Sequence, residues 1–189
     1  MRLVWVRKDG GLPACLSVEE HRRCDDFKHA GARQSFVQAR SKLRRLLGDR
    51  LECPPLELAI RIDPGGKPQV AGCQFNLSHS GDWILLGMTD ATPIGVDVEQ
   101  IRDRHVREIS ERFFSPAEQT RVGDDVFAMA EVWTAKESFL KAIGEGIRRP
   151  LRGIDLGLVN YDEWIEFEGV RVRSVWAPDG YAAAMAVVG

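Results

Sequence analysis

The side chains best suited to chemistry are three carboxylates and a lysine in two short segments. Residues 95–99 read GVDVE, and residues 133–146 read WTAKESFLKAIGEG. In the first segment apolar residues alternate with Asp97 and Glu99, which is the period-two pattern of a half-buried strand, so both carboxylates leave the same face. Two acids this close repel one another, and a hard cation such as Mg²⁺ would neutralise both.

The second segment has the spacing of a helix and carries the third acid. Its apolar residues recur at helical intervals, and glycines mark its end. Glu137 and Lys141 are four residues apart and are therefore neighbours on one face, which makes Glu137 the natural third metal ligand. The same spacing would suit a surface ion pair, just as Asp97 and Glu99 alone would suit a solvated strand edge.

A third segment supplies groups that can hold a phosphate. In residues 65–89 an apolar–polar alternation ends in Ser78, His79 and Ser80, before a second apolar run. A loop of this composition can present hydroxyls, main-chain N–H groups and an imidazole to an anion. The position is equally compatible with a structural role for His79.

Together these motifs resemble those of the 4′-phosphopantetheinyl transferases, in particular the larger surfactin-synthetase-activating (Sfp-like) type that works on carrier proteins. Five matching pieces cover roughly the middle half of the chain in the family's order: GKP (66–68), FNLSHSG (75–81), IGVDVE (94–99), RFFSPAE (112–118) and WTAKESFLKAIGEGI (133–147). Residues 21–47 resemble the family's arginine-punctuated first helices more loosely.

The resemblance implies an enzyme, a Mg²⁺-dependent holo-[acyl-carrier-protein] synthase. It would move phosphopantetheine from coenzyme A to a serine of an apo acyl, peptidyl or aryl carrier protein and release 3′,5′-ADP. Mg²⁺ would be held by Asp97, Glu99 and Glu137, with Lys141 as a fixed cation at the same phosphates. The general base would be Glu137 or a water on the metal.

The family pattern also implies a grip on coenzyme A. It assigns the adenosine 3′-phosphate and neighbouring groups to Lys67, Ser78 and His79, helped by Arg23 or Arg33. The role of Lys136 stays open, because it points about 100° around the helix from Glu137.

Two other classes of protein would use part of this pattern. A Mg²⁺-dependent phosphohydrolase or nuclease would use the same acids with water as the attacking group, but it would not account for the GKP and LSHS segments. A coenzyme A-binding module without activity would be expected to lack part of the acid set, which is complete here.

The elements that must position these groups are helices and strands in comparable amounts. The patterns predict a strand at 3–6, helices within 18–47, a strand at 56–62, a hairpin over 75–88, the strand bearing Asp97, helical stretches at 105–113 and 116–121, the helix containing residue 133, and closing strands. The resemblance implies an α+β fold of two similar halves, residues 1–91 and 92–189, related by a pseudo-twofold with the active site in the cleft between them.

Basic residues occur in two stretches. On the expected helix at 33–45, most of the charges would face solvent and one or two would close over an anionic cofactor; the set is Arg33, Arg40, Lys42, Arg44 and Arg45. The second stretch suits an acidic helical carrier protein in a shallow groove, although at least one of its phenylalanines should be a core residue. It contains Arg102, Arg104, Arg107, Arg112, Phe113 and Phe114.

Composition describes a soluble globular protein. The 189 residues are 44% hydrophobic and 29% charged, and the net charge of −2 argues against nucleic acid as a partner. No apolar run reaches the length of a membrane span, and the first residues turn polar too soon for a signal peptide, so we expect a cytoplasmic protein. We also expect a monomer, because one chain would supply both sides of the cleft. The four cysteines have no metal-ligand spacing and should be reduced.

Overall fold

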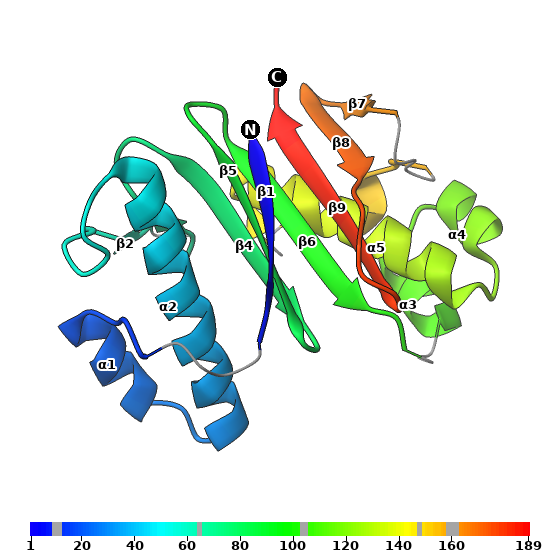
Figure 1. Cartoon of the computed structure of the whole chain (residues 1–189). Helices are drawn as coiled ribbons and strands as arrows, with labels where there is room; N and C mark the ends of the chain where they lie inside the picture. Colours follow the sequence, from blue (N-terminus) through cyan, green and yellow to red (C-terminus); the bar gives the residue numbers. More distant parts are fainter. Residues whose placement is uncertain (9–12, 64–65, 103–105, 147–148, 158–162) are drawn as a thin grey trace.

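Two main antiparallel sheets lie side by side, and each is accompanied by one long helix (Figure 1). The structure, a computed structural model, describes residues 1–8, 13–63, 66–102, 106–146, 149–157 and 163–189. The mixture of helices and strands confirms the expected α+β class. None of the described helices combines the length and the apolar character that crossing a membrane would require.

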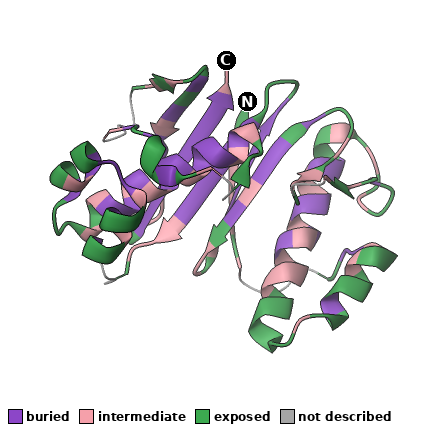
Figure 2. Cartoon of the chain, turned by 180° about the vertical axis from the view of Figure 1, so that it is seen from behind, coloured by how far each residue is buried: buried purple, intermediate pink, exposed green. Residues whose placement is uncertain are grey.

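The first sheet has the strand order β1-β5-β4. Along the chain its half contains β1 (Arg2–Arg7), α1 (Val18–Asp25), α2 (Ala30–Leu51), β2 (Arg61–Ile62), β3 (Pro68–Gln69), β4 (Gln74–Ser80) and β5 (Trp83–Thr89). The C-terminal part of α2 packs on this sheet, where Leu43 and Leu47 join Phe75, Leu86 and Met88 in one buried cluster. Figure 2 shows that α1 and the beginning of α2 are largely exposed.

The second sheet has the order β6-β9-β8-β7. Its half contains β6 (Ile94–Gln100), α3 (Val106–Phe113), α4 (Pro116–Val122), α5 (Val126–Ile143), a 3₁₀ turn (Leu151–Gly153), β7 (Ile165–Phe167), β8 (Val170–Ser174) and β9 (Tyr181–Val188). Helix α5 covers one face of this sheet with Ala135 and Phe139 in the core. Gly95 allows the close approach, because a Cβ there would lie 2.0 Å from the carbonyl oxygen of Ser138.

The two sheets share one connectivity. In each half a first strand leads into helices, the last two strands form an antiparallel pair, and the first strand pairs with the last one. The orders β1-β5-β4 and β6-β9-β8 are therefore equivalent.

Side chains instead of a main-chain ladder join the neighbouring strands β4 and β6. Three contacts ascend along both strands, so the strands run parallel: Asn76 Oδ1 accepts from the Val96 N–H at 2.9 Å, Ser78 donates to Asp97 at 2.7 Å, and Ser80 donates to Glu99 at 2.9 Å. We call this line of polar contacts the β4–β6 seam. It brings LSHS and DVE together.

Several expected elements are confirmed, including the strand at 3–6, the hairpin over 75–88 and the strand bearing Asp97. The strand predicted at 56–62 is wrong except for its last two residues, β2. The apolar alternation there follows two prolines, and the carbonyl of Pro54 accepts from the Glu57 N–H in a turn, which leaves Leu56 62% exposed. The loop predicted at 78–80 is also wrong, because these residues continue β4 and pair with β5.

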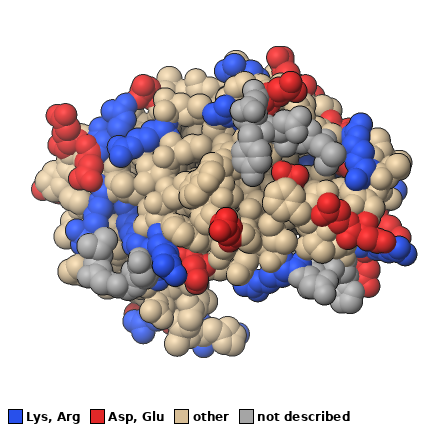
Figure 3. Space-filling model, turned by 45° about the vertical axis from the view of Figure 1, so that its right-hand side comes forward, with Lys and Arg blue, Asp and Glu red and all other residues tan. Residues whose placement is uncertain are grey.

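Charges of both signs lie on the surface. On the face seen in Figure 3, Lys and Arg side chains gather along the left edge and the middle is largely uncharged.

The four cysteines are free thiols, as expected.

Candidate active site

An ammonium, a hydroxyl and a carboxylate meet at the β4–β6 seam. Lys141 Nζ lies 2.5 Å from Asp97 Oδ1 and 3.1 Å from Ser78 Oγ, and the Ser78 hydroxyl donates to the same Asp97 oxygen at 2.7 Å. β4, β6 and α5 each contribute one of these residues. Glu137 lies one helical turn before Lys141, and with Glu99 and His79 it lines the same open hollow of about 350 Å³.

Only one of the two carboxylate oxygens of Asp97 has a hydrogen-bond partner. The residue is 4% exposed, and its second oxygen, Oδ2, is buried without a hydrogen-bond partner. A buried carboxylate oxygen without a partner costs free energy, so such an atom indicates a place for a ligand.

Negative charge accumulates around Glu137. Burial raises the pKa of this carboxyl, the carboxylates of Asp97 and Glu99 raise it further, and only Lys141 opposes them. Among the residues that the structure describes, no three acids, histidines or cysteines already converge as a complete metal-ligand set. The donors nevertheless fit a hard cation, since they are all carboxylate oxygens and one of them is the orphaned Asp97 Oδ2.

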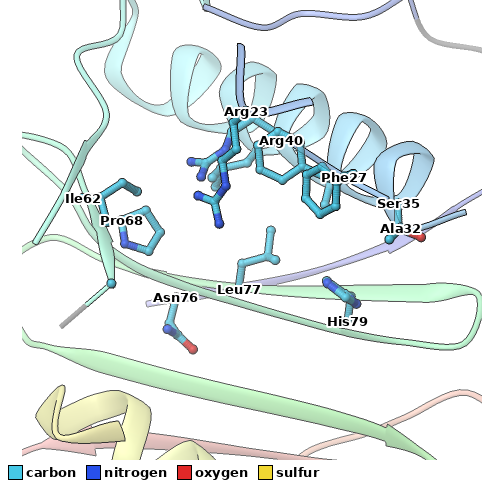
Figure 4. Close-up of a pocket in the computed structure, with 14 residues that line it drawn as sticks. Arg23, Phe27, Ala32, Ser35, Arg40, Ile62, Pro68, Asn76, Leu77 and His79 are labelled. Atoms are coloured by element: carbon cyan, nitrogen blue, oxygen red, sulfur yellow. The ribbon is translucent and has the colours of Figure 1, made fainter. Parts of the chain in front are cut away.

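A larger cavity of about 600 Å³ lies between the helices α1 and α2 and strand β4 (Figure 4). The guanidiniums of Arg23 and Arg40 stand 5.2 Å and 5.7 Å from the ring centre of Phe36, and both side chains point into the cavity. The Arg40 side chain is 10% exposed and pairs with Glu20 at 3.3 Å, yet its Nη1 is buried without a partner. Two guanidiniums and an aromatic ring suit a phosphate next to a planar base.

His79 lies where this cavity meets the hollow of the acids, since it lines both. Loss of hydration lowers the pKa of His79, and the positive charges of Lys8 and Lys141 lower it further. The neutral form of the imidazole is therefore favoured at pH 7, and in this form one ring nitrogen donates a hydrogen bond and the other accepts one.

The structure brings most of the expected site residues to one place. Ser78, His79, Asp97, Glu99, Glu137 and Lys141 line a single hollow, and Arg23 lines the larger cavity next to it. Arg33 instead lies on the surface, with its side chain 56% exposed, and pairs with Asp25 at 3.5 Å. The Lys67 ammonium donates to the main-chain carbonyls of Lys141 at 2.7 Å and Ile94 at 3.3 Å.

Arg40 and Phe36 were not singled out by sequence reasoning. Arg40 is one of five basic residues on the same helix, and Phe36 precedes it by four residues. Their separation of four residues, which stacks an arginine on an aromatic ring, was the available signal. The other members of the basic set have structural partners; Arg44, for example, is 2% exposed and pairs with Glu20 at 2.6 Å.

Lys136 has a structural environment. Its ammonium lies 2.6 Å from a carboxylate oxygen of Glu118, and both side chains are fully buried. It also donates to the main-chain carbonyls of Phe113, Leu151 and Ile154. The RFFSPAE and KES motifs are therefore connected by a buried ion pair.

The arginine-rich stretch is partly core, as expected. Phe114 is fully buried, while Phe113 packs edge-on against Trp133 with 5.3 Å between ring centres. Arg107 pairs with Asp124 at 2.6 Å. Arg104 lies outside the described residues.

Known proteins share this arrangement of motifs. A model of the 4′-phosphopantetheinyl transferase superfamily matches residues 93–180. A Synechocystis sp. protein provisionally named 4′-phosphopantetheinyl transferase slr0495 is 34% identical over 80% of this chain and 67% of its own length. A Bacillus subtilis 4′-phosphopantetheinyl transferase is 30% identical over 78% of this chain and 68% of its own. The transferase Sfp of Bacillus subtilis strain 168 is 26% identical over 76% and 66%, respectively. The chain therefore belongs to the 4′-phosphopantetheinyl transferase superfamily.

Proposed function

We propose that this protein transfers 4′-phosphopantetheine from coenzyme A to a serine hydroxyl of an apo carrier protein and releases 3′,5′-ADP. The observation that carries the proposal is that a cavity with two arginines and a hollow lined by three acids and Lys141 are neighbours, since Leu77 and His79 line both. A nucleotide with a reactive diphosphate needs both environments next to one another. Membership of the transferase superfamily supports the same reaction.

The reaction needs a proton acceptor and compensation of charge. The serine oxygen forms a bond to the phosphorus that carries the pantetheine, the bond from that phosphorus to the bridging oxygen breaks, and the electron pair leaves with 3′,5′-ADP. Glu137 is the group we assign to accept the serine proton, because its raised pKa brings it closer to neutral pH than an ordinary glutamate. Lys141, whose ammonium pairs with Asp97, supplies a positive charge beside the reacting diphosphate.

Asp97, Glu99 and Glu137 are the residues that would hold Mg²⁺. When bound, the ion neutralises charge on the diphosphate and orients it. The orphaned Asp97 Oδ2 and the crowding of carboxylates around Glu137 support this assignment.

The nucleotide end of coenzyme A belongs in the larger cavity. We assign the adenosine 3′-phosphate to Arg23 and Arg40, with His79 at the boundary, and the adenine to the surface near Phe36. The unpartnered Arg40 Nη1 supports this choice, since a phosphate oxygen would satisfy it. Arg33, the other expected helper, pairs with Asp25 instead.

The two halves, residues 1–91 and 92–189, are then related by a pseudo-twofold that passes near the β4–β6 seam. Their equivalent strand orders support this relation. A small apolar hollow adjoins Glu99 and Arg102. It is lined in part by Ile109, Met129 and Trp133. We assign the docking of an acidic helical carrier protein to the side of the molecule with this hollow, with the protein acting as a cytoplasmic monomer.

The test is a transfer assay with several purified apo carriers from fatty-acid, polyketide and nonribosomal-peptide systems. With coenzyme A and Mg²⁺, mass spectrometry should find one phosphopantetheine added to at least one carrier. Labelling should disappear when the carrier serine is replaced by alanine. Breakdown of coenzyme A without a carrier, and with no labelling of any carrier, would instead indicate a phosphohydrolase.

A further inference from the structure

Lys67 of the GKP motif reaches across the two halves of the molecule. Its ammonium donates to the carbonyl of Lys141 at 2.7 Å and to the carbonyl of Ile94 at 3.3 Å. Ile94 is the first residue of β6, and Lys141 lies in the last turn of α5. The lysine therefore links the β2–β3 region to both elements that carry the acids.

The main chain of Lys67 is itself held in place. Its N–H donates to Asp63 Oδ1 at 2.8 Å, and its carbonyl accepts from the Asp63 N–H at 3.0 Å. Asp63 thus fixes the main chain from which the lysine side chain starts.

The carbonyl of Lys141 needs such a donor. Lys141 is one of the last four residues of α5, and the carbonyls of these residues have no partner within the helix. The N–H of Gly144, the first residue after the helix, donates to the carbonyl of Leu140 and so is not a partner for Lys141. A cation at the C-terminal end also interacts favourably with the helix dipole. Burial lowers the pKa of Lys67, and the two carbonyls compensate for part of the hydration that its ammonium has lost.

The contact between α5 and β6, which Lys67 bridges, is tightly packed. A Cβ at Gly95 would lie 2.0 Å from the Ser138 carbonyl oxygen and 2.4 Å from the Ala142 nitrogen, so α5 is in direct main-chain contact with β6. A small displacement of the last turn of α5 would therefore move Lys141 relative to Asp97, from which its ammonium is 2.5 Å away.

We infer that Lys67 is a positioning residue: it holds the last turn of α5 against the start of β6 and so sets Lys141 relative to Asp97. The inference rests on the proposed transfer reaction and departs from the expectation that Lys67 grips the 3′-phosphate. The two roles predict opposite kinetics. A positioning residue acts on kcat and does not distinguish coenzyme A from its 3′-dephospho form, whereas a grip on the 3′-phosphate acts on the KM of coenzyme A alone.

The experiment measures transfer with both substrates for Lys67→Met and Lys67→Arg. Both variants should lower kcat, roughly 10- to 100-fold for Lys67→Met, because misplacement of catalytic groups by small distances has effects of this size. The KM for coenzyme A and the preference over 3′-dephospho-coenzyme A should stay at wild-type values. Arg61→Met, which removes an exposed cation from the same β2–β3 pair, is the matched control and should be unchanged.

Two results would overturn the inference. One is a selective rise in the KM of coenzyme A with kcat retained, which would return Lys67 to the phosphate. The other is normal kinetics in both variants. Lys67→Arg decides the matter should Lys67→Met not fold, because a guanidinium keeps the positive charge that would grip a phosphate but changes the length and geometry with which the side chain donates to the two carbonyls.

A double-variant cycle tests the route through Lys141. If Lys67 acts through Lys141, then Lys67→Met combined with Lys141→Met should be no slower than Lys141→Met alone. Multiplied losses would contradict this. If the wild-type protein transferred nothing to any carrier, the proposed function would fail; a wild type that transfers while the Lys67 variants behave normally would reject the positioning role alone.

Discussion

Asp97 satisfies two demands with its two carboxylate oxygens. One oxygen accepts from Ser78 and pairs with Lys141, which fixes the side chain, while the other is buried without a partner. An unpaired buried acceptor costs about 1–3 kcal/mol, an expense that a purely structural site would avoid. The residue is therefore held rigidly in a state that a cation or substrate can complete.

Replacement of Asp97 by alanine should abolish transfer and leave the fold intact. The loss in kcat should be at least about 100-fold, since an electrostatic group at the reacting atoms is removed. The thermal midpoint should change little, because Lys141 is 28% exposed and can be hydrated after its partner is lost. Asp90→Ala, which removes the exposed partner of Arg50, is the control. Full activity of Asp97→Ala, or of the wild type in EDTA, would reject the metal assignment.

His79 should make coenzyme A binding depend on pH. Its pKa is lowered from the ordinary value of 6.5, so the imidazole is neutral at pH 7 and becomes charged only as the pH falls below that value. A charged imidazole attracts phosphate, so wild-type affinity should rise on acidification more steeply than that of His79→Gln. Calorimetric titrations from pH 5 to pH 7.5 measure both curves. Parallel curves would show that His79 does not face the ligand's phosphates.

Among the elements, those with a regular hydrophobic period could be predicted from the sequence. The apolar residues of β6 alternate with polar ones, and those of α5 recur at helical spacing. Both elements contribute to the core, where Val96 and Phe139 are fully buried. The segment at 56–62 alternates as well, but a turn after two prolines prevails over the pattern. The direction of a long polar side chain could not be predicted from the sequence. Lys67 and Lys136 donate to main-chain carbonyls that are far away in the sequence and are brought near only by the tertiary fold.

The contact between α5 and β6 should be intolerant of a single methyl group. Gly95→Ala places a Cβ against main-chain atoms of α5, so the elements must separate. The free energy of unfolding should fall by about 1–3 kcal/mol or more, with a parallel loss of transfer. Gly31→Ala, on α2 with open space around its Cβ, should be neutral or stabilising by about 0.5–1 kcal/mol. Urea denaturation of both variants provides the measurement, and equal stability of the two would contradict the packing argument.

The buried pair of Lys136 and Glu118 should contribute to stability rather than to chemistry. Lys136→Met leaves the Glu118 carboxylate buried without its cation and should cost about 3–5 kcal/mol. Arg107→Met, which breaks an exposed ion pair with Asp124, should leave the free energy of unfolding nearly unchanged. Chemical denaturation compares them. At a temperature where Lys136→Met is folded, its KM for coenzyme A should equal the wild-type value; a selective change in that KM would place Lys136 at the substrate.

At the scale of the whole molecule, the two sheets are joined where the proposed reaction occurs. A main-chain ladder between β4 and β6 would close the sheets into one and occupy the edge groups, whereas the seam uses the side chains of Asn76, Ser78 and Ser80. The same hydroxyls touch Asp97 and Glu99. The geometry of the site therefore depends on the same contacts that lie between the two sheets.

Coenzyme A with Mg²⁺ should stabilise both halves together. A ligand that binds only the folded state adds about 2.7 kcal/mol at 100 times its Kd. For a chain of this size that is a rise in the thermal midpoint of roughly 5–10 °C. Calorimetry should show a single transition that moves as a whole, because the proposed ligand contacts α2 and β4 of one half and β6 and α5 of the other.

The size of that shift also tests how the nucleotide is held. 3′-Dephospho-coenzyme A should give a smaller rise than coenzyme A, and Arg40→Ala should remove most of the difference, since its unpartnered Nη1 is assigned to the 3′-phosphate. Arg33→Ala is the matched control: it lies on the same helix but pairs with Asp25 on the surface, and it should keep the full difference. An unshifted transition at saturating coenzyme A, or two transitions of which only one moves, would mean that the ligand does not bridge the β4–β6 seam.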